Sequence, residues 1–219
     1  MPLDASDTAD SLAGLIAASA RAGDAAKPRP VERWNPAYCG EIDMRIRQDG
    51  SWIYNGSPIG RAALVRLFAS ILRKDEDRYV LVTPVEKVGI VVEDVPFIAT
   101  AMRVEAGADG ESLVFETNMG DETRIGSEHA LRFETGAHDG IKPYVHVRGG
   151  LWARLTRALT HDLVDRAVER RDEDASGGAT WLGIVSGGLF FRMCKVEEMA
   201  ADEMMADEMT AEVSASGSP

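Results

Sequence analysis

Cysteine is scarce in this chain: its 219 residues contain two, Cys39 and Cys194. Two cysteines cannot build the disulfide framework that stabilises small secreted domains, so we expect the chain to fold in a reducing compartment. Cys39 stands before a glycine in a predicted loop, where a thiol beside a histidine could act as a nucleophile. None of the four histidines lies at a diagnostic spacing from it, and the pattern favours a buried structural thiol.

Long apolar runs are also missing. The longest, residues 181–191, has about half of the ~20 residues that a membrane-spanning helix needs, and it predicts a buried strand or hairpin. The N-terminus carries Asp4, Asp7 and Asp10 where a signal peptide needs positive charge. We therefore expect an uncleaved, cytoplasmic chain with no membrane span.

Positive charge is in deficit, with a net charge of −12. Residues 195–219 contain seven acids and one lysine, a net charge of −6, so the preceding 194 residues also carry −6. Duplex nucleic acid needs clustered cations, and this acidity disfavours it as a partner. The tail repeats its acidic and methionine residues with a period of five, which builds no apolar stripe on a helix. We interpret residues 195–219 as an acidic disordered tail.

Specific catalytic motifs are absent as well. The sequence has no GxxxxGK[ST] loop, no GxGxxG, no HExxH, no GxSxG and no paired CxxC. His138, Asp139 and His146 could be metal ligands, but histidines in a turn and a strand are typical of solvated or hydrogen-bonded side chains. Residues 186–188, Ser-Gly-Gly, lack the lysine and helix of a phosphate-binding loop and predict a hairpin turn. We therefore predict no catalytic residue and no metal ligand, and we name no cofactor.

The chain does contain an internal repeat. Residues 42–72 and 130–168 each follow the order strand, Asp-Gly turn, strand, glycine, helix, with helices predicted over 62–72 and 151–168. The matching order and spacing predict a duplicated unit. In the first helix the spacing of apolar residues places Phe68 on the core-facing side.

Short β-branched runs between and after these segments predict further strands. The fold class predicted is α+β: a duplicated strand-strand-helix unit arranged as two tandem half-barrel domains. A short helical apolar pattern in the leader suggests a docking helix. We divide the chain into leader, two repeat units and tail, at residues 1–30, 31–96, 97–194 and 195–219.

Two arginines occupy equivalent points of the repeats. Arg61 and Arg148 stand at the predicted helix starts, where backbone N–H groups and the helix dipole favour an anion. The arginine fork suits phosphate or carboxylate. The candidate ligand-binding residues are Arg61, Lys87, Asn118, Tyr144, Arg148 and Arg154. The alternative is that the cations pair with acids such as Glu86, Asp94 or Glu134 and only hold the two units together.

Five motifs stand out within residues 31–192. They are Trp34-Asn-Pro-x-x-Cys-Gly-x-Ile-Asp-Met-Arg-Ile, Gly56-Ser-Pro-Ile-Gly-Arg61, Val82-Thr-Pro-Val-Glu-Lys87, Pro143-Tyr-x-x-Val-Arg148 and the Trp-x-Gly-x-x-Ser-Gly-Gly-x-Phe-Phe pattern at 181–191. In these motifs the chain resembles the bacterial family called domain of unknown function 1285. The resemblance implies a domain duplication, a C-terminal unit like a pleckstrin-homology half-barrel, a site for a nucleotide-like ligand between the two units, and a link to signal transduction. It implies no established activity.

We therefore expect a non-catalytic binding or signalling module for a small anionic, nucleotide-like ligand at a cleft between the units. An enzyme that uses the same cleft and a protein–protein interaction module remain alternatives. Titratable groups with perturbed pKa values in the cleft would favour the enzyme. An exposed apolar patch of more than a few hundred Å² would favour a protein partner.

Overall fold

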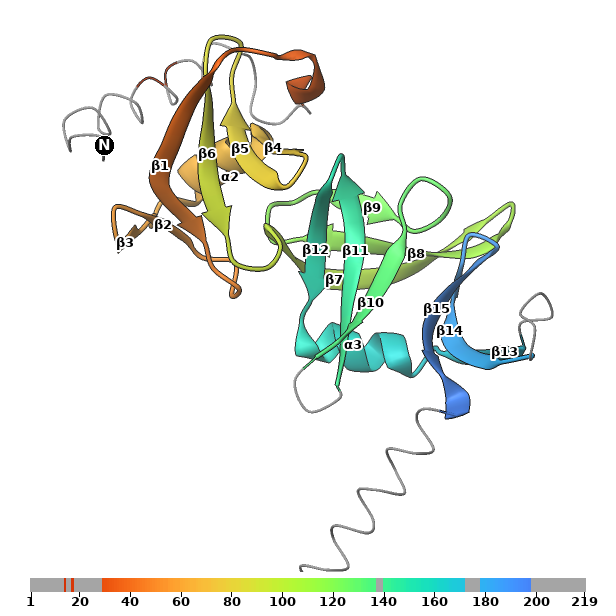
Figure 1. The fold of residues 1–219 in the computed structure, drawn as a ribbon. Coiled ribbons are helices and arrows are strands. Elements are labelled where there is room, and N and C mark those ends of the chain that lie inside the picture. Colours follow the sequence, from red (N-terminus) through yellow and green to blue (C-terminus); the bar gives the residue numbers. More distant parts are fainter. Residues whose placement is uncertain (1–13, 15–16, 18–28, 137–139, 172–177, 198–219) are drawn as a thin grey trace, which may run out of the picture. The chain divides into compact units, whose positions relative to one another are not determined.

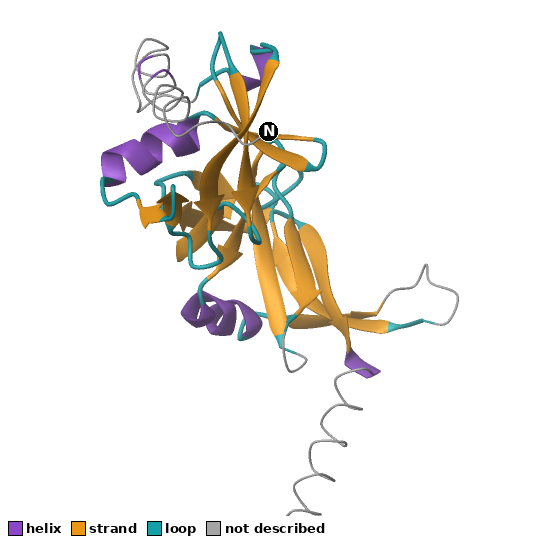
Figure 2. Ribbon diagram, turned by 60° about the vertical axis from the view of Figure 1, so that its left-hand side comes forward, coloured by secondary structure: helices purple, strands orange, loops and turns teal. Residues whose placement is uncertain are grey.

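The computed structural model describes residues 14, 17, 29–136, 140–171 and 178–197. Within them the chain is mainly β-sheet with two helices of eight or more residues (Figures 1 and 2). Contacts divide it into two compact units. The first comprises Met1–Thr100, Glu116–Glu122 and His146–Arg154, and the second Ala101–Phe115, Thr123–Val145 and Leu155–Pro219. The predicted docking helix falls largely outside the described residues, although Gly14 and Ala17 are helical.

The first sheet has six strands in the order β3-β2-β1-β6-β5-β4. Its elements are the 3-10 helix η1 (Val31–Arg33), β1 (Tyr38–Ile46), β2 (Trp52–Tyr54), β3 (Ser57–Pro58), α2 (Ala62–Ser70), β4 (Leu72–Asp75), β5 (Arg78–Val82) and β6 (Lys87–Val92). Two antiparallel meanders, β1-β2-β3 and β4-β5-β6, meet where β1 pairs in parallel with β6. One helix, α2, connects the two meanders.

The second sheet repeats this strand order. Its elements are β7 (Phe97–Gly107), β8 (Gly110–Thr117), β9 (Glu122–Arg124), β10 (Leu131–Thr135), β11 (Ile141–Arg148) and β12 (Leu151–Leu155), followed by α3 (Arg157–Val164). The order β10-β11-β12-β7-β8-β9 again places the first strand of one meander beside the last strand of the other. The chain therefore consists of two tandem, mainly β domains, and one of its sheets is a half-barrel.

The predicted alignment of the two repeats is wrong in detail. It matches β1 with β10, but β1 lies between β2 and β6, whereas β10 is at the edge of its sheet. The helix predicted over 151–168 is also wrong, since residues 151–155 form strand β12 and only Arg157–Val164 is helical. Along β12 burial alternates with a period of two, which is the pattern of a strand. Asp139 of the second predicted turn lies outside the described residues.

Helix α2 packs on the first sheet through the face that the apolar spacing predicts (Figure 1). Phe68 is fully buried and stacks on Trp52, with ring centroids 6.3 Å apart. The helix ends at Ser70, two residues earlier than predicted, because Leu72 is the first residue of β4 and its side chain is buried there. The prediction that Phe68 belongs to the core is confirmed.

A third sheet has three strands in the order β13-β14-β15, with bounds Val168–Arg171, Thr180–Ser186 and Leu189–Lys195. Gly187 and Gly188 join β14 to β15 with φ angles of +55° and +74°, which confirms the predicted hairpin turn. The buried Ser186 hydroxyl accepts a hydrogen bond from Leu113 N and donates one to Ile125 O, each 2.9 Å long. Among the described residues, no helix has the length and apolar character needed to cross a membrane.

Candidate functional site

A pocket of about 280 Å³ lies at the N-terminus of α2, and we call it the α2 pocket. Its lining residues are Gly50, Ser51, Trp52, Pro58, Ile59, Gly60, Ala62, Val65, Arg66, Asn118 and Met119. Arg66 carries the one charge among these described lining residues, and none of them is acidic. A cavity with apolar walls, positive charge and no carboxylate is suited to an organic anion.

The start of α2 borders this pocket through Gly60 and Ala62. Arg61 is the N-cap residue, with an extended backbone, and its side chain makes no capping hydrogen bond. The first intrahelical bonds run from Leu64 N and Val65 N to Arg61 O, so the amides of Ala62 and Ala63 have no acceptor within the helix. No acidic residue stands in the first turn. The predicted position of Arg61 at a helix start is therefore confirmed, and its exposed side chain adds charge to the positive end of the helix dipole.

Asn118 is held in the pocket wall by a reciprocal pair of hydrogen bonds. The side-chain Oδ1 of Asn118 accepts a hydrogen bond from the backbone N of Ile98 at 3.1 Å. The backbone N of Asn118 donates one to Ile98 O at 2.8 Å. Because Oδ1 is used in this way, the donor Nδ2 is the group that faces Gly50. Gly50 has a φ of +81°, and a Cβ at this position would lie 2.9 Å from Ile98 Cγ1 and 3.1 Å from Asn118 Nδ2. Only glycine tolerates both constraints.

Trp52 closes the pocket on the side of the core. Its side chain is 2% exposed, and its Nε1 has no hydrogen-bond partner among the described residues. An unsatisfied buried donor is uncommon in native structures. The sequence patterns do not single out Gly50, Trp52 or Arg66 as site residues, and Gly50 has a local signal only as part of the Asp49-Gly50 turn.

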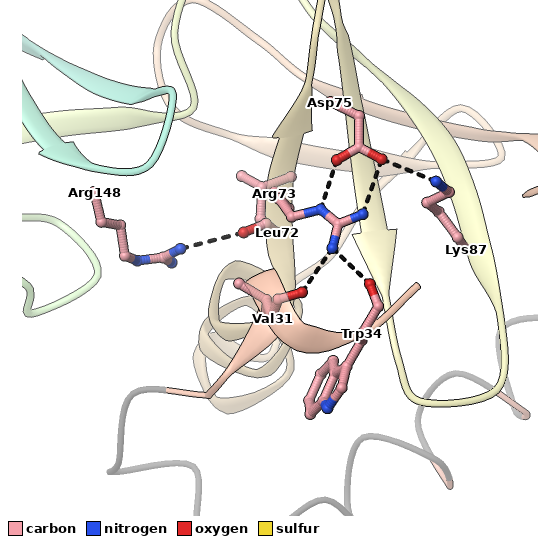
Figure 3. Close-up of polar contacts among 7 residues, drawn as sticks. All are labelled: Val31, Trp34, Leu72, Arg73, Asp75, Lys87 and Arg148. Atoms are coloured by element: carbon pink, nitrogen blue, oxygen red, sulfur yellow. Dashed lines mark hydrogen bonds and ion pairs between the residues drawn. The ribbon is translucent and has the colours of Figure 1, made fainter. Parts of the chain in front are cut away.

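Arg148 does not stand at a helix start. It ends β11, and Gly149 and Gly150 turn the chain into β12. Its guanidinium donates to Ala69 O, at the C-terminal end of α2, at 2.7 Å. It also donates to Leu72 O, at the start of β4, at 3.2 Å (Figure 3). Cations are stabilising at the C-terminal end of a helix because its last carbonyl groups lack intrahelical donors. Burial lowers the pKa of Arg148, although nearby Asp121, 3.9 Å away, opposes this shift.

The prediction that Arg61 and Arg148 occupy equivalent positions at two helix starts is therefore wrong. The two residues lie at opposite ends of α2, and a helix of nine residues is about 13 Å long. Arg61 adds positive charge at the positive end of the helix dipole, whereas Arg148 donates to Ala69 O at the negative end.

Arg154 and Lys87 also make structural contacts. Arg154 donates to Gln48 O at 2.8 Å and lies 3.9 Å from Asp94, as the ion-pair alternative proposed. Lys87 donates to Asp75 Oδ2 at 2.9 Å rather than to Glu86 (Figure 3). These contacts agree better with structural pairing than with a ligand-binding role.

Tyr144 does not line an accessible surface. Its side chain is fully buried, and the cations of Arg132 and Lys142 lie 4.7 and 5.7 Å from its ring centroid. Its predicted ligand contact is therefore wrong, because Tyr144 lies in the buried stretch 143–145 of β11.

A second, larger concavity of about 1090 Å³ is open to solvent, and we call it the Asp75 groove. Its charged lining residues are Glu32, Asp75, Glu76, Asp77, Arg73, Lys74, Arg78 and Lys87, four of each sign. The guanidinium of Arg73 donates to both carboxylate oxygens of Asp75, at 2.5 and 2.9 Å. It also donates to Val31 O and Trp34 O, both at 2.7 Å (Figure 3). Hydrogen bonding by Arg73, and then by Lys87, lowers the pKa of Asp75.

The cysteine and metal predictions have different outcomes. Cys39 is exposed, so the prediction of a buried thiol is wrong; the edge position of Tyr38–Gly40 at the start of β1 leaves its side chain in solvent. In the part of the chain that the structure describes, no three His, Cys, Asp or Glu side chains are grouped to hold a metal. His138 and Asp139 lie outside that part, and His146 contacts Gly149 O and Trp152.

Two family models match the chain. Residues 29–95 match the N-terminal domain of DUF1285, a domain of unknown function, and residues 96–193 match its C-terminal domain. A crystal structure of a DUF1285 family protein from Silicibacter pomeroyi DSS-3 is similar, with 43% identity, a TM-score of 0.74, and coverage of 85% of this chain and 98% of that one. Another, from Shewanella baltica OS155, has 31% identity, a TM-score of 0.46, and coverage of 56% and 90%. No curated protein matches the chain.

Proposed function

The chain belongs to the DUF1285 family, and we propose that it is a non-catalytic protein that binds a small organic anion in the α2 pocket. One observation carries the proposal: Arg66 and the start of α2 line a pocket that no described acidic residue lines, and Arg61 is the N-cap residue between the lining residues Gly60 and Ala62. Backbone N–H groups, the helix dipole and arginine all act in the same direction on an anion.

The pocket suggests the class of ligand. Its volume of about 280 Å³ is near the lower end of the range for small-molecule sites, roughly 300–1,000 Å³. Ile59, Val65 and Met119 offer apolar contact, and Asn118 offers an amide donor. A compact carboxylate or phosphate ester fits this combination, including a mononucleotide with its phosphate at the start of α2.

Three further statements remain proposals. We propose a pleckstrin-homology-like fold for the C-terminal domain, supported by two meanders followed by α3. A role in signal transduction rests on the family resemblance, and a cytoplasmic location rests on the acidic N-terminus.

The enzymatic alternative has no observation in its favour at the α2 pocket. None of the described lining residues is a carboxylate, histidine or cysteine that could act as an acid or base.

The protein-docking alternative has one observation in its favour. The Asp75 groove is wide and lined by both charge signs, and at its edge Tyr38 is 41% exposed. Mixed charges around an exposed aromatic side chain are typical of a protein-binding surface.

A thermal-shift screen of nucleoside monophosphates and small organic acids tests the proposal. An anion at about 100 times its Kd stabilises the fold by about 2.7 kcal/mol, which raises the Tm of a chain of this size by roughly 5–10 °C. Arg61→Met and Arg66→Met should abolish most of the shift, whereas Arg33→Met, an exposed control in η1, should retain it. No shift with any anion, or an equal shift in all three variants, would contradict the proposal.

A further inference from the structure

One face of the third sheet gathers cations on aromatic rings. The register of β14 with its neighbours places alternate residues of the three strands on a common side. This side, which we call the cationic face, carries Arg170, Trp181, Gly183, Phe190, Arg192 and Lys195. Apart from Gly183, each of these side chains is exposed or half-buried, so the face is open to solvent.

The rings hold the cations in defined positions. Arg192 and Lys195 lie 5.4 and 5.8 Å from the ring centroid of Trp181, and Arg170 lies 5.4 Å from that of Phe190. A Cβ on Gly183 would lie 2.6 Å from Phe190 Cζ, so Phe190 lies flat against the glycine. Cations stacked on aromatic rings lose less freedom when they bind a carboxylate than isolated flexible side chains do.

The charge of this face is opposite to that of the whole protein. Three cations and, among the described positions, no acid share it, in a chain with a net charge of −12. Beside them Val185 is 47% exposed and offers apolar contact. The complementary ligand is therefore an acidic segment with interspersed apolar side chains.

The chain contains such a segment. Residues 197–219 have seven carboxylates and no lysine or arginine, with methionines at 199, 204, 205 and 209. Methionine packs well on aromatic rings. The segment begins two residues after Lys195, and its 23 residues reach up to roughly 75 Å when extended. A strand of seven residues such as β14 is about 23 Å long, so reach is not limiting.

We propose that the acidic segment 197–219 binds the cationic face of its own chain. The strength of the contacts favours this occupant over a separate acidic protein. Solvent-exposed ion pairs are individually weak, so three of them hold a free peptide poorly. A segment attached next to the face has an effective concentration on the order of millimolar, which is enough to occupy a weak site.

Cleavage of the full-length chain by a glutamate-specific protease tests the proposal. At low salt, cleavage within 197–212 should be roughly twofold to tenfold slower in the wild type than in Arg170→Glu/Arg192→Glu, as expected for bound-to-free ratios of about one to ten. The difference should vanish at about 1 M salt, where the Debye length is about 3 Å. Arg171→Glu reverses one charge on the opposite face of β13, as Arg170→Glu does on the cationic face, and should behave as the wild type.

Three results would overturn the proposal. Equal cleavage of the wild type and the double variant at low salt excludes binding to this face. Protection that falls on tenfold dilution shows that the segment binds a second copy instead. Loss of protection in Arg171→Glu as large as in the double variant shows that the segment does not bind the cationic face specifically. If the double variant melts at a lower temperature than the wild type, Arg192→Gln replaces it, with a smaller expected change in the same direction.

Discussion

The two six-stranded sheets have the same strand order but carry their helices at different points. In the first sheet α2 connects the two meanders, whereas in the second α3 follows the last strand and residues 125–130 connect the meanders. The α2 pocket is built from the β3–α2 connection, so it belongs to the first arrangement. The strand order is therefore duplicated, whereas the helix connection that lines the α2 pocket occurs only in the first of the two described six-stranded sheets.

The largest expected effect comes from the core contact that fixes α2 on its sheet. Phe68→Ala should destabilise the fold by about 3–5 kcal/mol, because a fully buried ring is removed. Leu163→Ala should cost about 2–5 kcal/mol, because it removes a fully buried side chain of α3. Urea unfolding measures both. A loss below about 1 kcal/mol for either residue would show that its helix is not anchored as described.

The two ends of α2 should respond differently to loss of their arginines. Arg148→Met removes charge-assisted hydrogen bonds to Ala69 O in the last turn of α2 and to Leu72 O in β4, and it should destabilise by about 1.5–3 kcal/mol. Arg61→Met removes an exposed side chain that makes no capping hydrogen bond, and it should change stability by about 0.5 kcal/mol or less. Thermal unfolding of both variants checks this contrast. Equal losses would mean that Arg61 also has a structural role.

The Asp75 groove predicts a dependence of stability on pH. Hydrogen bonds from Arg73 and Lys87 hold the pKa of Asp75 below its ordinary value of 3.8. The stabilisation is therefore present above that value and is lost as pH falls through the lowered pKa. In Asp75→Asn the free energy of unfolding should decrease less steeply as the pH falls. Urea unfolding at a series of pH values between about pH 5 and pH 2 measures this dependence. If the variant and the wild type lose stability equally at acidic pH, the contacts of Asp75 with Arg73 and Lys87 do not stabilise the fold as described.

The smallest effect concerns the acidic tail. Removal of residues 196–219 should leave the melting transition nearly unchanged, because the five-residue repeat builds no core stripe and exposed ion pairs contribute at most about 1 kcal/mol. Calorimetry of the full and shortened chains measures the difference. A cooperative loss of structure would show that the tail belongs to a core.

The sequence predicted local features well where one element determines them. The apolar spacing around Phe68 predicted its burial, the Gly187-Gly188 pair predicted a hairpin, and the glycine before Arg61 predicted a helix start. Each of these depends on residues within one or two turns of the chain.

Features that depend on pairing between distant segments were not predictable in the same way. Arg148 contacts carbonyls 76 and 79 residues away, so its capping of α2 has no local sequence pattern. The edge position of β10 and the burial of Tyr144 depend on which strand pairs with which. Gly50 and Asn118 meet in the α2 pocket for the same reason.

A titration followed by backbone amide resonances tests the central claim most directly. On addition of a nucleoside monophosphate to the full chain, the amides of Ala62 and Ala63 should shift together with the side-chain amide of Asn118, and Arg61→Met should weaken binding by roughly tenfold. Such a result would place the anion at the start of α2. Saturable shifts confined to the Asp75 groove, around Tyr38 and Lys87, or no saturable shift with any anion of the screen, would contradict the account.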